Sequence, residues 1–72
     1  MNNTKKKTLR TMVTMLTDLK NELEAIKDDE EDLLERTSEN SSRYDDIEER
    51  VGSLEDAVSA MEEAIDSIDC VL

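Results

Sequence analysis

Apolar side chains recur at alternating intervals of three and four residues from Leu9 to Leu72. This spacing is that of a heptad repeat, whose a and d positions form one apolar stripe along a helix. Polar residues interrupt the stripe only near the middle of the chain, where Glu30, Thr37 and Asn40 occupy a and d positions. The repeat predicts an all-α protein whose helices pack against one another as in a coiled coil.

The predicted core consists of the apolar a and d residues on either side of this interruption. On the first side they are Leu9, Met12, Leu16, Leu19, Leu23, Ile26 and Leu33, and on the second side Ile47, Val51, Leu54, Val58, Met61, Ile65 and Ile68. The chain has no proline and the single glycine Gly52, which agrees with long helices because both residues destabilise helix interiors.

Chain length and residue content favour assembly over internal cross-links. A chain of 72 residues buries little apolar surface by itself, so small domains usually need disulfides, metals or partners. Cys70 is the only cysteine and there is no histidine, so an intrachain disulfide and the usual zinc ligands are excluded. We expect a homo-oligomer with no metal and no cofactor. We also expect no enzymatic activity, because the chain has no histidine to serve as the base of a nucleophilic triad.

The polar segment 37–42 is predicted to be a turn between two helices. Its Thr, Ser, Asn and Glu side chains include several that compete for backbone hydrogen bonds. We predict a flexible basic arm over 1–7, then one domain over 8–72 with a helix over 8–36 and a helix over 43–70. Ser42 is the predicted N-cap of the second helix, with Asp45 in its first turn.

An antiparallel hairpin about this turn pairs each a residue with a d residue. Seven of the eight resulting layers are apolar on both sides, for example Met12 with Ile65. The remaining pairs are Leu9–Ile68, Leu16–Met61, Leu19–Val58, Leu23–Leu54, Ile26–Val51, Leu33–Tyr44 and the mixed Glu30–Ile47. On the flanks, Lys20 and Lys27 are expected to meet Glu48, Glu55 and Glu62, and Arg50 to meet Asp29. Flank charges also fit a continuous parallel rod of about 95 Å, so that alternative stays open, with the hairpin favoured.

Apolar residues beyond the a and d positions widen the stripe of both helices. They include Val13, Met15 and Leu34 in the first helix and Ala57, Ala64 and Val71 in the second. A stripe of this width leaves apolar surface on a closed hairpin. We therefore expect hairpins to associate into a four-helix or larger bundle.

The charge of the chain is strongly acidic and unevenly distributed. The net charge is −11, with +3 over residues 1–27 and −14 over residues 28–72. Such a surface repels nucleic acid, whose binding requires neutralisation of phosphates by Lys and Arg. No apolar stretch is long enough to span a bilayer, and a lone cysteine suits a reducing compartment. We expect a cytoplasmic protein that binds neither nucleic acid nor membranes.

One cluster of residues around the turn has the chemistry of an anion site. Arg36, Arg43 and Arg50 recur at seven-residue spacing. Tyr44, the only aromatic residue, is adjacent, and Glu30 and Asn40 complete the candidate site. Guanidinium groups bind phosphate or carboxylate through paired hydrogen bonds, and a phenol ring can stack on a base. The alternative is that these arginines only form ion pairs with neighbouring carboxylates.

The stretch Ser38-Glu39-Asn40-Ser41-Ser42-Arg43-Tyr44 and the later Leu-Glu-x-Ala units resemble small acidic helical proteins of phages and prophages of Gram-positive bacteria. The chain lacks the proline and leucine of that group's turn. The resemblance implies an accessory protein of a mobile element, acting in the bacterial cytoplasm. It also implies the sponge type of anti-defence protein, which binds and sequesters a nucleotide-derived immune signal.

Two other functions remain open from the residues alone. A coiled coil of this kind can serve as a structural or adaptor protein that presents helices to a host protein. Acidic runs such as residues 28–32 can instead imitate nucleic acid and occupy the basic groove of a host protein.

Overall fold

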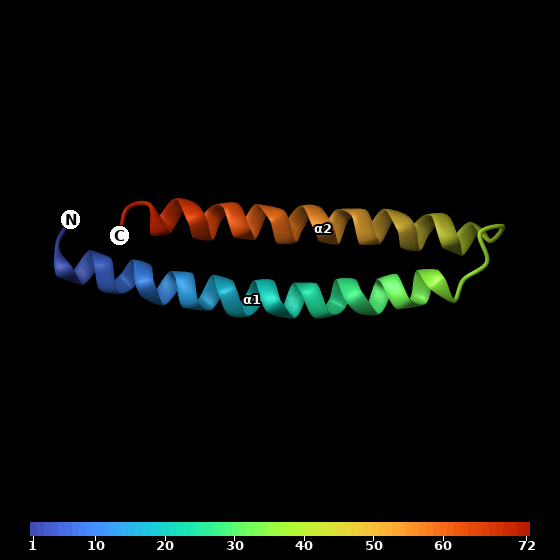
Figure 1. Ribbon diagram of the computed structural model, residues 1–72, viewed down its shortest axis with the longest axis horizontal. Coiled ribbons are helices and arrows are strands. Elements are labelled where there is room, and N and C mark those ends of the chain that lie inside the picture. The colour runs from blue at the N-terminus through green and yellow to red at the C-terminus, as the bar shows by residue number, and fades with distance from the viewer.

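The structure is a computed structural model that describes residues 1–72, and it contains two long helices. Helix α1 spans Asn3–Glu35 and helix α2 spans Ser42–Asp69. They lie side by side and run in opposite directions, so both termini lie at one end and the connection at the other (Figure 1). The longest dimension is 57 Å, far below the 95 Å or so of a continuous helix. The predicted all-α antiparallel hairpin is confirmed.

Helix α1 begins earlier than the sequence pattern suggested. The side-chain oxygen of Asn2 accepts a hydrogen bond of 2.8 Å from the backbone N–H of Lys5, so Asn2 acts as the N-cap. Residues 3–7 therefore belong to the helix and not to the separate flexible arm predicted over 1–7. At the other end Arg36 is the C-cap, and its backbone N–H reaches the carbonyl oxygens of Asp32 and Leu33.

The connection reverses the chain within residues 36–41, close to the predicted turn over 37–42. Ser41 has extended backbone angles, and its hydroxyl accepts a hydrogen bond of 3.1 Å from the backbone N–H of Arg43. The N-cap of α2 is therefore Ser41, and the prediction of Ser42 was wrong by one residue, because Ser42 already has helical geometry. Asp45 lies in the first turn of α2, where a negative charge interacts favourably with the helix dipole.

The core of the single hairpin is small. Only Ile47, Val51 and Val58 are buried, and all three belong to α2. Ile47 is 1% exposed and is the most completely enclosed side chain. These residues occupy a and d positions. The side of α2 that packs against α1 is therefore the predicted one.

Helix α1 faces α2 with a side different from the predicted one. Its d residues Met12, Leu19 and Ile26 are 45%, 50% and 52% exposed. The a residues are half-buried instead, together with Val13, Lys20 and other residues at e positions. The predicted layers that place Met12, Leu19 and Ile26 inside the hairpin are therefore wrong for the single chain. Lysine stems at e positions cover apolar surface while their ammonium groups reach water or a carboxylate. The a and e side of α1 can therefore pack against α2 in place of the predicted a and d side.

The flank pairs agree with the predicted pairs only in part. Lys20 lies 4.0 Å from Glu62 of α2, as expected, and 3.7 Å from Glu24 of its own helix. Lys27 pairs with Glu31 at 3.9 Å within α1, and not with the predicted glutamates of α2. All of these pairs are solvent-accessible, so each contributes at most about 1 kcal/mol.

Truncation of the best-enclosed side chain tests this description of the core. We predict that Ile47→Ala lowers the free energy of unfolding by about 2–3 kcal/mol, because it removes buried methyl groups and leaves a cavity. Val71→Ala truncates a side chain that is 51% exposed and serves as the control, with an expected change within about 0.5 kcal/mol. Urea denaturation followed by circular dichroism at matched concentrations measures both. Equal losses for the two variants would show that Ile47 is not in the core.

Candidate functional site

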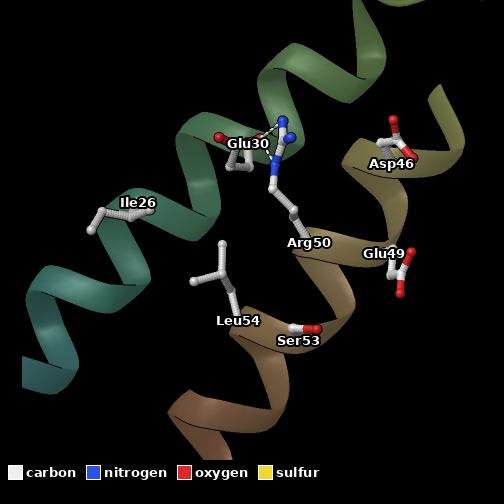
Figure 2. Close-up of a pocket in the computed structure, with 7 residues that line it drawn as sticks. All are labelled: Ile26, Glu30, Asp46, Glu49, Arg50, Ser53 and Leu54. Atoms are coloured by element: carbon white, nitrogen blue, oxygen red, sulfur yellow. Dashed lines mark hydrogen bonds and ion pairs between the residues drawn. The ribbon is translucent and has the colours of Figure 1, made fainter. Parts of the chain in front are cut away.

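The structure brings together two members of the predicted cluster. Arg50 of α2 reaches across to Glu30 of α1 (Figure 2), with its Nη2 at 2.9 Å and its Nε at 3.3 Å from the same carboxylate oxygen. The sequence-based pairing of Arg50 with Asp29 is therefore wrong by one position. Glu30 is an a residue, and the a residues of α1 face α2 in the structure as in the predicted layers. The charge of Arg50 is largely compensated within the chain.

The remaining members lie at or near the tip of the hairpin and do not enclose a site. Arg36, Asn40 and Arg43 are exposed, and Tyr44 is half-buried. The Nε of Arg36 donates to the carbonyl oxygen of Asp32 at 3.2 Å. No carboxylate lies within ion-pair distance of Arg36 or Arg43. Two guanidinium groups thus remain available at the tip, on a surface without a pocket.

The one hollow that contains members of the cluster has the wrong charge for an anion. It lies beside Arg50, is open to solvent and has a volume of about 620 Å³. Figure 2 shows the residues that line it: Ile26, Glu30, Asp46, Glu49, Arg50, Ser53 and Leu54. Three carboxylates against one guanidinium make the hollow negative. Sequence reasoning missed Asp46, Glu49 and Ser53, although the heptad positions of residues 46 and 53 place them on one side of α2.

Other kinds of site find little support in the structure. No group of three or more Cys, Asp or Glu side chains is arranged to hold a metal ion. Cys70 is exposed and unpaired near the end of α2. Neither helix combines the length and the apolar character that crossing a lipid bilayer requires.

The most extensive unexplained feature is an apolar stripe on the outer side of α1. We define the α1 stripe as Met12, Met15, Leu19 and Ile26, which are between 45% and 59% exposed. Their d and g positions fall on one side of the helix, away from the a and e positions that face α2. Sequence reasoning assigned three of these residues to the hairpin core, and assigned Met15 to the wider stripe.

The exposed area of the chain is large for its mass. The accessible surface is 5330 Å², whereas a compact monomer of 8.2 kDa has about 4,500 Å². Large apolar side chains that are exposed along one side of a helix are typical of interaction sites. The structure therefore identifies the α1 stripe as a second candidate site, of a different kind from the tip.

Comparison of the chain with known protein families, with curated proteins and with solved structures found no match. The resemblance to small phage proteins stays a prediction.

A double-mutant cycle tests the Arg50–Glu30 contact. We predict a coupling free energy of about 0.5–1 kcal/mol between Glu30→Gln and Arg50→Gln, because one partner is largely exposed to water. The coupling should fall in 1 M salt, where screening is stronger. Thermal or urea unfolding of the four proteins provides the values. A coupling near zero at low salt would mean that the two side chains do not form the pair in solution.

Proposed function

We propose that this protein is a non-enzymatic interaction module that acts by packing the α1 stripe against another helical surface. The observation that carries the proposal is the position of Met12, Leu19 and Ile26. These residues have the heptad spacing of a buried seam, yet they lie outside the hairpin. A seam of this spacing packs into the grooves of a facing helix.

The residue types of the stripe also support protein contact. Two of the four are methionines, whose flexible side chains adapt to a partner and are frequent at binding surfaces. Charged residues surround the stripe, which gives the apolar centre and polar rim of a protein interface. The hairpin itself supplies a rigid backbone over about 50 Å of helix.

Site-specific photo-crosslinking tests this proposal. We predict that a benzophenone side chain at position 19 forms a covalent adduct with protein in cells that naturally produce the chain. The same group at Asn21 is the matched control, because Asn21 is exposed on a side of α1 away from the stripe. Adducts from position 19 at several times the yield from position 21 are expected. No excess at position 19 would contradict the proposal.

A second candidate function is the capture of a small nucleotide-derived anion at the tip, which is the sponge function that the phage resemblance implies. It is supported by the two exposed arginines, Arg36 and Arg43, that have no carboxylate partner, and by the nearby ring of Tyr44. The pairing of Arg50 with Glu30 removes one predicted ligand contact. A complete pocket for such a ligand requires a further copy of the chain. The adaptor to a host protein and the nucleic-acid mimic also stay hypotheses.

Calorimetry with cyclic dinucleotides and cyclic ADP-ribose variants tests the sponge hypothesis. If the tip binds such a ligand, Arg43→Ala should weaken binding at least tenfold, because a charge-assisted hydrogen bond contributes about 1.5–3 kcal/mol. Lys7→Ala removes a positive charge at the far end of α1 and is the control, with unchanged binding. Absence of heat with every ligand, or equal effects of the two substitutions, would exclude the hypothesis.

A further inference from the structure

We infer that the α1 stripe is the contact between two copies of this chain, arranged antiparallel about a two-fold axis near Leu19. This inference rests on the proposed function and names the partner of the same surface. The dimer contains four helices, and the two α1 helices lie at the centre of the contact. Each hairpin keeps its own α2 on the side away from its partner.

The charge distribution along α1 favours an antiparallel arrangement of the two α1 helices. Basic residues concentrate at its beginning, with Lys5, Lys6, Lys7 and Arg10, and the continuous acidic run 28–32 lies near its end. A two-fold axis at Leu19 places the beginning of one α1 beside the end of the other. Lys5 is at a d position, and it then lies near Asp29, at a g position of the second copy. Opposite charges meet at both ends of the contact.

A parallel arrangement of the same surface is unfavourable for the same reason. It would align each charged residue at the d and g positions with its own copy, so that Lys5, Glu22 and Asp29 would all meet like charges. Like-charge contacts across an interface suppress the wrong partner or orientation. Glu22 is the one charged residue inside the stripe, between Leu19 and Ile26. In the antiparallel dimer the two copies of Glu22 lie on opposite sides of the axis.

The hairpin leaves surface available for a homodimer contact. The accessible surface of 5330 Å² exceeds the value for a compact monomer of its mass by about 800 Å². The open hollow beside Arg50 adjoins the stripe, since Ile26 lines the hollow and also belongs to the stripe. With the axis at Leu19, Met12 of one copy lies next to Ile26 of the other, at the edge of that hollow.

The first half of α1 also has a weak intrinsic preference for helix. It contains several threonines, and four of them, Thr8, Thr11, Thr14 and Thr17, direct their hydroxyls to the carbonyl oxygen four residues earlier. Threonine has a low helix propensity, and this hydrogen bond slightly destabilises the helix. Association over residues 5–33 would cover this segment and stabilise it.

Disulfide trapping between two tagged chains tests the arrangement. Both chains carry Cys70→Ser, one carries Met12→Cys and the other Ile26→Cys. After mixing and mild oxidation we expect the mixed disulfide to exceed either homodisulfide at least fivefold. The reason is that the antiparallel axis brings positions 12 and 26 together, whereas a parallel pair separates them by about 21 Å along the helix. Leu19→Cys should cross-link to itself, and Asn21→Cys should not.

Two results would overturn this inference. Homodisulfides of Met12→Cys as the main product would indicate a parallel contact. A monomer in analytical ultracentrifugation at 100 μM or so, without disulfides at any position, would exclude a second copy.

In the photo-crosslinking experiment, an adduct of twice the chain mass supports the inference. An adduct with a different protein removes it and leaves the proposed function standing, whereas no adduct removes both.

A charge substitution provides a test without cysteines. Leu19→Lys should weaken self-association at least tenfold, because it places two ammonium groups at the axis. Its helix content should stay within the range of the parent, since Leu19 lies outside the hairpin core. Asn21→Lys adds the same side chain away from the contact and should leave association unchanged. Equal association of the parent and both variants would contradict the inference.

Discussion

The narrow apolar contact between α1 and α2 is the interaction on which the rest of the structure depends. It encloses only Ile47, Val51 and Val58, and all three project from α2. Because α1 contributes its a and e positions, long lysine stems replace apolar d residues along the contact. This arrangement closes the hairpin with a minimum of buried surface, which is a weak basis for stability in a chain of 72 residues. Further association is the expected source of the missing stabilisation.

The same arrangement determines which surfaces are available for function. The pairing of Glu30 with Arg50 takes one arginine out of the predicted anion cluster. Rotation of α1 moves Met12, Leu19 and Ile26 to the outside, next to Met15. The first feature weakens the case for a compact positive pocket within one chain, and the second strengthens the case for a helical interface. Both consequences follow from which side of α1 faces α2.

Heptad spacing and turn chemistry favoured the hairpin over a continuous rod, since the polar segment 37–42 marks the reversal and the regular spacing marks both helices. They could not predict the rotation of α1. Its d residues are apolar, but its e residues include Val13 and lysines with long aliphatic stems, so two adjacent sides of the helix can serve as the contact. The prediction that the three arginines lie together was wrong in part for another reason. Seven-residue spacing aligns Arg36 with Arg43 only on a continuous helix, and the turn lies between them.

Isotope-filtered nuclear Overhauser measurements on an equal mixture of labelled and unlabelled chains test the central claim most directly. The account predicts that methyl groups of Ile47 and Val51 contact α1 of their own chain. It also predicts that the methyl group of Met12 contacts Ile26 of the other chain and does not contact α2 of its own chain. Contacts from Met12 to α2 of the same chain would contradict it, because Met12 would then lie inside the hairpin.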